Sequence, residues 1–298
     1  MTKVLVTGSS GFVGRNLIDK LRGSSMEIVE FTGRVDEDDA FVDYENLGID
    51  HVLHLAAKTI VPDSWQRPQE FYRANVLGTL GVLGFCEKTG STLTFISSYL
   101  YGTPESLPIT ESAPTDPTNP YALTKLAAED ACRFYAKFKN IGVCILRPFN
   151  IYGDGQSEDF LIPNVISQIN SSEIDEIVLK DLEPRRDYIH IEDLVDLIVA
   201  TANRRPAPGS CEVYNAGSGD SYSVTEIVGL IKNIIGSTKG VRSLGQRRDG
   251  EIMDTRADCH KANEAFDWTP KIDIEEGLGL IISSMEPRQQ TSNTAQPR

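Results

Sequence analysis

The chain of 298 residues lacks the features that mark several special classes of protein. Its five cysteines are odd in number, widely spaced and form no Cys-x-x-Cys pair, so neither a disulfide framework nor a zinc site is predicted. No run of about 18 apolar residues occurs, and the chain starts with a strand-like segment where a signal peptide would need a charged and then an apolar region. We therefore expect free thiols, no membrane partner and a cytoplasmic location.

Basic charge is also scarce, because 29 lysines and arginines face 43 aspartates and glutamates and the formal net charge is −14. Nucleic-acid phosphates need a basic surface, so a nucleic acid is not expected as the main partner. The four histidines show no metal-ligand spacing, and we expect no metal site. Anionic small ligands remain compatible with this composition wherever arginines gather locally.

The first half of the chain alternates short apolar runs with amphipathic segments. This pattern predicts strands at KVLVT, EIVEF, FVDY, HVLHLA, TLTFIS and VCILRPFN, and helices at residues 12–21, 71–88 and 121–139. Strands that alternate with helices of this length indicate right-handed crossovers and a parallel sheet covered on both faces. The predicted fold class is therefore α/β, with a Rossmann-like doubly wound parallel sheet.

The second half has longer loops, more proline and glycine, and only isolated strand candidates. Helices are predicted near residues 160–170, 192–203, 223–235 and 274–284, and strands at EIVLK and CEVYN. We assign residues 1–155 to a dinucleotide-binding domain, to which segments near 187–215 return, and residues 156–286 mainly to a smaller α+β substrate-binding lobe. Residues 287–298 are polar and without periodicity, and are predicted to form a disordered tail.

A glycine-rich turn, GSSGFVG at residues 8–14, directly follows the first predicted strand and opens the first helix. Glycine is favoured at Gly8, Gly11 and Gly14 because the turn is tight, the backbone must approach a pyrophosphate and the helix must pack close to the strand. The spacing is one residue longer than the usual dinucleotide fingerprint. Its place between a strand and a helix favours a dinucleotide site over simple turn chemistry.

Further motifs follow in order: HLAAK at 54–58, NVLGT at 75–79, ISSYLYG at 96–102, Tyr-x-x-x-Lys at 121–125 and RPFNIYG at 147–153. With the glycine turn they resemble the extended short-chain dehydrogenase/reductase family, in its nucleotide-sugar epimerase, dehydratase and reductase branch. The likeness covers nearly the whole chain. It implies a nicotinamide cofactor, NADP or NAD, held by Gly8, Gly11, Phe12, Val13, Gly14, Thr32, Arg34, Asp43, Leu55, Ala56, Ala57, Lys58, Tyr121, Lys125 and Pro148.

The pattern Tyr-x-x-x-Lys occurs twice, at Tyr121/Lys125 and at Tyr135/Lys139, so position must decide which pair is catalytic. In a doubly wound sheet ligands bind where helices begin after the strands, and Tyr121 directly follows Pro120 at a predicted helix start. Tyr135 lies about 21 Å further along the axis, at about 1.5 Å per residue. We therefore assign Tyr121 and Lys125 to the site, and interpret Tyr135 as partly packed and Lys139 as solvated.

Tyr121 and Lys125 are one helical turn apart and project from the same face. A phenol is a poor base at neutral pH, and a nearby ammonium is expected to lower its pKa by favouring phenolate. The resemblance implies that Tyr121 is the general acid/base and that Lys125 also holds the nicotinamide ribose. It further implies a catalytic hydroxyl after the strand TLTFIS, and counting back four residues from Tyr101 selects Ser97; a slip of one residue would select Ser98.

Dehydratases of this branch resemble one another in carrying an acidic residue just after that hydroxyl, where this chain has Ser98 and Tyr99. Dehydration is therefore not expected, and hydride transfer at a sugar carbon remains. The intact hydroxyl, phenol and ammonium argue against a non-catalytic dinucleotide sensor. The resemblance implies a nucleotide-diphosphate-sugar substrate, whose phosphates suit guanidinium groups, bound by Ser98, Asn150, Arg186 and Arg248.

The cofactor form depends on the end of the second predicted strand, where NAD-binding members of this fold carry a carboxylate. The matching residue is Thr32, and Arg34 can offer a guanidinium to the 2′-phosphate of NADP. Two alternatives stay open: Arg34 is simply solvated, or Glu30 or Asp36 replaces the acid through a shifted turn. NADP favours a 4-keto-sugar reductase over an NAD-dependent 4-epimerase, because an epimerase regenerates its bound nicotinamide in each cycle.

The resemblance also implies a homodimer. Family members commonly pair through the helix near residues 73–88 and the Tyr121 helix, which form a four-helix bundle. The residues alone leave the alternative open that the same helical faces pack internally.

Overall fold

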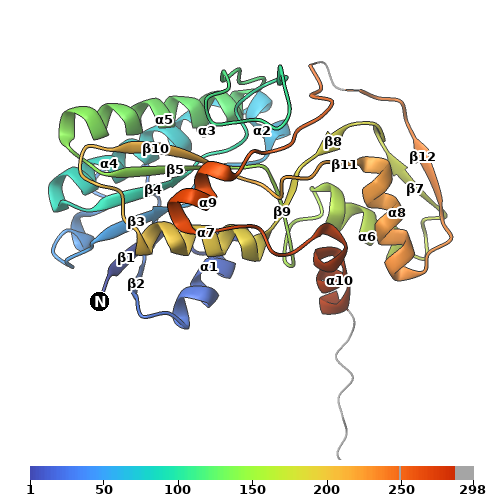
Figure 1. Ribbon diagram of the computed structural model, residues 1–298, viewed down its shortest axis with the longest axis horizontal. Coiled ribbons are helices and arrows are strands. Elements are labelled where there is room, and N and C mark those ends of the chain that lie inside the picture. The colour runs from blue at the N-terminus through green and yellow to red at the C-terminus, as the bar shows by residue number, and fades with distance from the viewer. Residues whose placement is uncertain (248–249, 286–298) are drawn as a thin grey trace, which may run out of the picture.

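The centre of the fold is a parallel β-sheet with helices on both faces (Figure 1). The computed structural model describes residues 1–247 and 250–285. The strand order is β10-β5-β4-β3-β1-β2, with bounds β1 (Lys3–Thr7), β2 (Glu27–Glu30), β3 (His51–His54), β4 (Thr92–Ile96), β5 (Val143–Pro148) and β10 (Cys211–Ala216). The direction of winding reverses between β1 and β3, which confirms the expected Rossmann-like doubly wound sheet.

Each face of the sheet is covered by its own hydrophobic layer. On one face α1 (Phe12–Arg22), α7 (Ile191–Asn203) and α9 (His260–Phe266) pack over Val4 and Val6. On the other face α4 (Gly78–Thr89) and α5 (Pro120–Lys139) pack over Leu5. Neighbouring residues of β1 therefore enter opposite layers, as the two-residue period of a strand requires. Burial on both faces explains why the strands read as continuous apolar runs.

The segment before α4 departs from a regular helix. The helix predicted over residues 71–88 is present as α3 (Pro68–Phe71), the π-helical segment η2 (Tyr72–Leu77) and α4, and a short α2 (Val61–Gln66) precedes it. The strand predicted at FVDY is wrong, because Val42–Tyr44 form a 3-10 turn, η1. Phe41 and Tyr44, which are three residues apart, both pack on Phe31, while Val42 between them is exposed. This spacing suits a 3-10 turn, which has three residues per turn.

A smaller lobe with its own hydrophobic cluster lies beside the sheet, on the right of Figure 1. It contains α6 (Leu161–Asn170), α8 (Val224–Ile235), α10 (Ile274–Met285) and the parallel pair β7 (Glu176–Leu179) with β12 (Gly240–Ser243). Two further pairs are β6 (Asn150–Tyr152) with β9 (Tyr188–His190), and β8 (Arg185–Arg186) with β11 (Tyr222–Ser223). CEVYN, as β10, belongs to the central sheet and pairs with β5. The tail predicted at residues 287–298 lies outside the described residues.

Candidate functional site

The glycine loop between β1 and α1 has the shape that a dinucleotide phosphate site requires. Gly8 has a φ of 74°, in the left-handed region, and a Cβ there would stand 2.6 Å from the Ala56 amide nitrogen. A Cβ on Gly14 would stand 2.1 Å from the Gly8 carbonyl oxygen, so α1 approaches the loop this closely only with glycine. Within the described chain, Gly11 caps α1 without a side-chain hydrogen bond, which leaves first-turn N–H groups for an anion. The loop therefore fits a pyrophosphate.

The other residues predicted for the cofactor lie around this loop, mostly at the carboxyl ends of strands. Leu55, Ala56, Ala57 and Lys58 directly follow β3, Phe12 and Val13 open α1, Pro148 ends β5, and Asp43 is exposed in η1. The carboxyl ends of β1, β2 and β3 thus bring together segments that are far apart in the sequence. This edge is where doubly wound folds bind their ligands.

Thr32 and Arg34 lie just beyond β2, beside the glycine loop. The Thr32 backbone N–H donates to the Tyr44 hydroxyl at 3.0 Å. Arg34 donates twice to the Asp36 carboxylate, at 3.2 and 2.9 Å, so it is paired and not simply solvated. Glu30, the remaining alternative for the acid, is the exposed last residue of β2.

A buried hydrogen-bond network supports the loop that follows β3. The His54 ring bonds the Thr7 hydroxyl at 2.7 Å and the Thr79 hydroxyl at 3.1 Å, and Thr79 donates to the Asn75 carbonyl at 2.6 Å. Asn75 accepts from the Lys58 N–H at 2.8 Å and donates to the Lys58 carbonyl at 3.0 Å. Burial lowers the pKa of His54 to about 3, so its ring stays neutral. The network fixes the cofactor loop to the sheet and to η2.

This network could not be predicted from the sequence, although Asn75 and Thr79 belong to the NVLGT motif. Asn75 also donates to the Thr124 hydroxyl at 2.9 Å, and Thr124 donates to the Tyr121 carbonyl at 2.7 Å. These partners come from segments that only the fold brings together. Asn75 therefore links the cofactor loop to the start of α5.

Tyr121 and Lys125 lie in the first turns of α5. Asn119 caps the helix, accepting from the Ala122 N–H at 2.9 Å, and Pro120 occupies the first helical position. Lys125 is only 3% exposed, its Nζ lies 4.3 Å from the centre of the Phe95 ring, and burial lowers its pKa to about 7. The Tyr121 and Lys125 side chains therefore lie on one face of α5, near the carboxyl ends of the strands.

The expected lowering of the Tyr121 pKa does not occur in the structure. Burial raises the pKa of Tyr121, and the nearby Ser98 side chain offsets only part of that increase. The phenol is thus held in its protonated form.

The second Tyr-Lys pair belongs to the packing of the fold. Tyr135 is half-buried against the hydrophobic layer beneath α5. Lys139 is exposed and forms an ion pair with Glu87 of α4 at 2.8 Å. Neither residue faces the glycine loop end of α5, because both lie more than three turns away along the helix.

The two neighbouring serines, Ser97 and Ser98, have different surroundings in the structure. Ser97 Oγ donates to Glu129 at 2.6 Å, and Glu129 is held by Arg147 in a buried ion pair at 2.6 Å. The serine that interacts with Tyr121 is Ser98. Successive side chains at a strand end point to opposite sides, so a count that is wrong by one residue selects the wrong face.

Two of the predicted substrate residues lie on short strands outside the central sheet, Asn150 on β6 and Arg186 on β8. Asn150 is exposed at the start of β6, directly after β5. Arg186 donates to the Ile252 carbonyl at 2.6 Å and forms a close ion pair with Glu251. Arg248, the other predicted arginine, lies outside the described residues.

Comparison with known proteins identifies the family. The model of the NAD dependent epimerase/dehydratase family matches residues 4–217. The chain belongs to this family. Among its relatives, GDP-6-deoxy-D-mannose reductase of Pseudomonas aeruginosa is 30% identical over 96% of this chain and 98% of its own length. The putative UDP-glucose 4-epimerase of Methanocaldococcus jannaschii is also 30% identical, over 97% of this chain and 100% of its own length.

Solved structures of family members agree with this chain over nearly its whole length. RMD from Pseudomonas aeruginosa complexed with NADPH is 29% identical with a TM-score of 0.87, covering 95% of this chain and 98% of that one. MoeE5 in complex with UDP-glucuronic acid and NAD is 30% identical with a TM-score of 0.85, covering 94% and 98%. A nicotinamide dinucleotide is therefore the cofactor of this chain, which belongs to the extended short-chain dehydrogenase/reductase branch and thus to the nucleotide-sugar epimerases, reductases and dehydratases.

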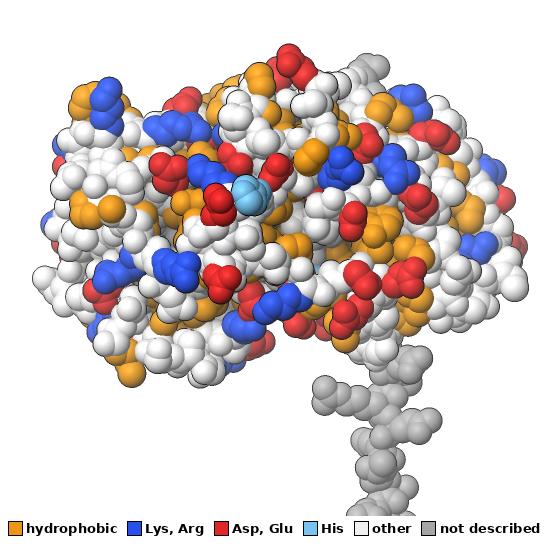
Figure 2. Space-filling model, viewed as in Figure 1, with side chains coloured by type: hydrophobic (Ala, Val, Ile, Leu, Met, Phe, Trp, Pro, Cys, Tyr) orange, Lys and Arg blue, Asp and Glu red, His pale blue; other side chains and the backbone are white. Residues whose placement is uncertain are grey.

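Two other features of this family member concern its surface. In the described residues, no helix has both the length and the apolar composition needed to cross a membrane. A hollow of about 640 Å³ between α8 and α10 is lined by Tyr222, Leu230, Glu226, Asp273 and Glu275 among others. Figure 2 shows apolar side chains beside acidic ones over these helices. Among the described residues that were predicted for the site, none lines this hollow.

Proposed function

We propose that the chain transfers hydride at C4 of a nucleotide-diphosphate sugar, and that its net reaction is the reduction of a 4-keto sugar. The observation that carries this proposal is that Tyr121 and Lys125 at the start of α5 lie near Ser98 and Phe95 at the end of β4. A hydroxyl, a phenol and an ammonium at such positions suit proton transfer to a sugar oxygen. Relatives named as acting on GDP-6-deoxy-D-mannose and UDP-glucose support the substrate class.

Each of the three side chains has a separate role in this proposal. A bound nicotinamide dinucleotide would exchange hydride with the sugar carbon. Tyr121 gives its proton to the sugar oxygen as the carbonyl becomes an alcohol, Ser98 donates a hydrogen bond to the same oxygen, and Lys125 stabilises the phenolate that remains. Burial raises the pKa of Tyr121, and a phenol that holds its proton suits the reducing direction.

We assign NADP(H) as the cofactor, held on its adenosine side by Arg34. Thr32 stands where NAD-binding members of this fold carry a carboxylate, and Arg34 offers guanidinium N–H groups two residues on. The alternative is an NAD-dependent 4-epimerase, which the relatives named UDP-glucose 4-epimerase favour. Dehydration is disfavoured, because Tyr99 occupies the position of the acid and its hydroxyl donates to the Gly102 carbonyl at 2.6 Å.

We assign the substrate diphosphate to Arg186 and Asn150, together with Arg248. Arg186 would exchange its bond to Glu251 for a phosphate oxygen, a charge-assisted contact of the same kind. Structures of relatives hold UDP-glucose or UDP-glucuronic acid, which supports a nucleotide sugar as ligand without selecting the base or the sugar.

Two assays on the purified protein test the reaction. In the first, NADPH and NADH are each supplied with a 4-keto-6-deoxy nucleotide sugar and the oxidation of the cofactor is followed by absorbance. In the second, UDP-glucose is incubated without added reduced cofactor and the sugar is identified after hydrolysis. Net oxidation of NADPH supports the reductase. Epimerisation with tightly bound NAD, and no net oxidation of NADPH, would overturn it in favour of the epimerase.

A further inference from the structure

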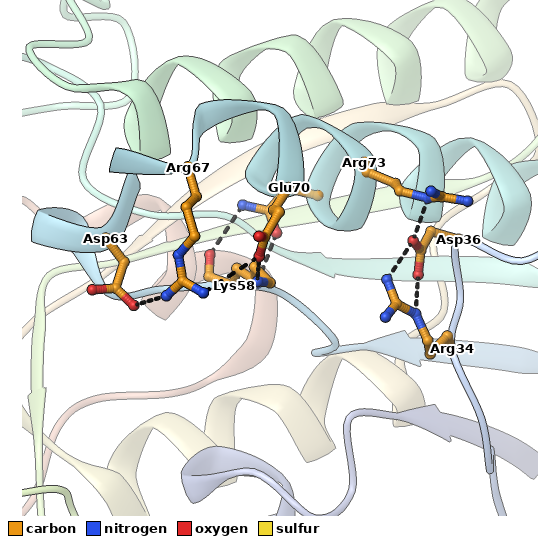
Figure 3. Close-up of polar contacts among 8 residues, drawn as sticks. Arg34, Asp36, Lys58, Asp63, Arg67, Glu70 and Arg73 are labelled. Atoms are coloured by element: carbon orange, nitrogen blue, oxygen red, sulfur yellow. Dashed lines mark hydrogen bonds and ion pairs between the residues drawn. The ribbon is translucent and has the colours of Figure 1, made fainter. Parts of the chain in front are cut away.

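Two arginines from different parts of the chain share one carboxylate beside the predicted adenosine site. Arg34 donates to both Asp36 oxygens, at 3.2 and 2.9 Å, and Arg73 Nε lies 3.1 Å from Asp36 Oδ2. Figure 3 shows Asp36 between the two guanidinium groups, with Arg34 on the segment after β2 and Arg73 on η2. Arg34 and Arg73 are separated in the chain by η1, β3, α2 and α3, and the sequence alone does not predict that they meet.

This ion cluster is next to the glycine loop. β1 and β2 pair in parallel with Val6 opposite Glu30, and the Phe31 N–H donates to the Val6 carbonyl at 2.9 Å. Thr32 therefore stands level with the start of the glycine loop, and Arg34 follows two residues later. In doubly wound folds this edge takes the adenosine half of the dinucleotide.

At Asp36 itself, two guanidinium groups face a single carboxylate. The Asp36 side chain is 4% exposed, whereas those of Arg34 and Arg73 are 61% and 64% exposed, so their outer N–H groups face solvent. A second carboxylate, Glu37, forms a longer ion pair with Arg34 at 3.9 Å on the exposed side of the cluster. The neighbouring cluster in Figure 3 is balanced, since Arg67 and Lys58 face Asp63 and Glu70. The Arg34 cluster thus presents two exposed guanidinium groups on one carboxylate, where a dianion can reach both.

Asp36 is poorly placed to bind ribose hydroxyls in the way an NAD-specific carboxylate does. Both of its oxygens already face guanidinium nitrogens, and the side chain is almost fully buried. Two guanidinium groups this close would repel each other without a carboxylate between them. The geometry thus suits a carboxylate that holds two cations in place.

We propose that Arg73 is a second determinant of cofactor specificity, and that Asp36 is a positioning residue that aims Arg34 and Arg73 at one phosphate monoester, the 2′-phosphate of NADP(H). This inference rests on the proposed use of NADP(H). Planar guanidinium groups bind phosphate oxygens in pairs, and two of them on one phosphate discriminate more strongly than one.

Equilibrium binding of two probes tests the inference without any dependence on turnover. Calorimetry on the full chain compares 2′,5′-ADP with 5′-ADP, which differ only in the 2′-phosphate, for the wild type and for Arg34→Ala, Arg73→Ala and Asp36→Asn. Arg67→Ala is the matched control, because this arginine is also exposed, also paired with an aspartate and lies on the neighbouring segment. Circular dichroism melts verify that each variant is folded.

We expect Arg34→Ala and Arg73→Ala each to weaken 2′,5′-ADP about tenfold, the scale of one charge-assisted hydrogen bond, with 5′-ADP unchanged. Arg67→Ala should alter neither probe. Asp36→Asn is the sharper variant, because it removes a negative charge near the phosphate. Simple electrostatics would then tighten 2′,5′-ADP, whereas a positioning role predicts weaker binding, by about threefold or more.

The outcomes separate this inference from the proposal on which it rests. A wild type that binds the two probes equally would overturn the use of NADP(H) itself, whereas an Arg34→Ala variant that keeps its full preference would overturn the role of Arg34 in binding the 2′-phosphate. A preference that disappears in Arg34→Ala but persists in Arg73→Ala leaves the cofactor proposal intact and overturns the role of Arg73. Tighter 2′,5′-ADP in Asp36→Asn overturns the positioning role alone.

Discussion

Tyr121 is the residue on which the proposed chemistry depends most directly. Tyr121→Phe removes the transferable proton and leaves the ring, so we expect turnover to fall by at least about a hundredfold while NADPH binding stays within about twofold. Tyr135→Phe is the matched control, because Tyr135 lies on the same helix among packing residues. Steady-state kinetics and fluorescence titration with NADPH measure the two effects. Loss of turnover in Tyr135→Phe instead would contradict the choice between the two tyrosines.

The neighbouring serines are expected to respond differently to the loss of a hydroxyl. Ser98→Ala removes the group that interacts with Tyr121, so we expect turnover to fall about tenfold or more at unchanged stability. Ser97→Ala leaves Glu129 without one of its buried donors, so it should cost about 1–3 kcal/mol of unfolding free energy and leave turnover nearly unchanged. Turnover and urea denaturation of both variants give the comparison. The reverse pattern would restore the original assignment of Ser97.

Lys125 is a residue at which function opposes stability. Folding lowers its pKa from the ordinary value to about 7, so the unfolded chain binds one more proton between about pH 7 and pH 10. The free energy of unfolding therefore rises with pH through that window. Below about pH 7 the folded protein carries the full cost of burying the charged Lys125 ammonium. We expect Lys125→Met to abolish turnover and yet raise the unfolding free energy at pH 7, on the order of 2 kcal/mol. Urea denaturation at pH 7 and pH 9.5 should show this gain shrinking as the pH rises.

At this scale the sequence predicted residue types better than orientations. The positions of Tyr121 and Lys125 at a helix start followed from the pattern alone, because Pro120 and the end of a strand mark that start. The side of the strand on which Ser97 lies did not follow, since it depends on where β4 ends and the loop to Tyr101 begins. The role of Arg73 could not be predicted either, because its partner Asp36 lies close to it only in the folded chain.

Among the elements, strands buried on both faces and long amphipathic helices were predictable because their patterns are continuous. The segment FVDY was misread because four apolar and polar residues fit a strand or a turn equally well, and the stacking of Phe41 and Tyr44 on Phe31 decides for the turn. The π-helical segment η2 has no sequence signature of its own. The wider turn of this segment nevertheless contains Asn75, whose side chain contacts both the loop after β3 and α5.

The junction that Asn75 makes can be tested as a property of η2. Asn75→Ala leaves the Lys58 N–H and carbonyl without their buried partner and breaks the link to Thr124. We expect a loss of about 1–3 kcal/mol in unfolding free energy and weaker NADPH binding, since the loop after β3 loses its support. Thr89→Ala, which removes a hydroxyl from the far end of α4, should leave NADPH binding unchanged. Wild-type affinity in Asn75→Ala would contradict the supporting role.

For the whole molecule, the outer faces of η2 and α5 favour a homodimer, which we propose on the family resemblance and on exposure. Leu77, Leu123, Phe134 and Phe138 are all exposed apolar residues, and the last three fall on one stripe of α5. We expect sedimentation to give about twice the 32.8 kDa of one chain, and Phe134→Glu with Phe138→Glu to give a monomer. Leu280→Glu, on the exposed side of α10, should not change the mass. A monomeric wild type would contradict the proposal.

The place of β10 beside β5 bears on how this chain leaves the ribosome. β5 is synthesised long before β10, since residues 149–210, which include α6 and α7, come between them. All six residues of β5 are buried in the finished protein, so the nascent sheet carries an open apolar edge during that interval. Such edges pair readily with other chains. The growing chain can therefore complete its sheet only once Ala216 has left the ribosome, and not when the first 155 residues have. Pauses in translation before that point would lower the yield of folded protein.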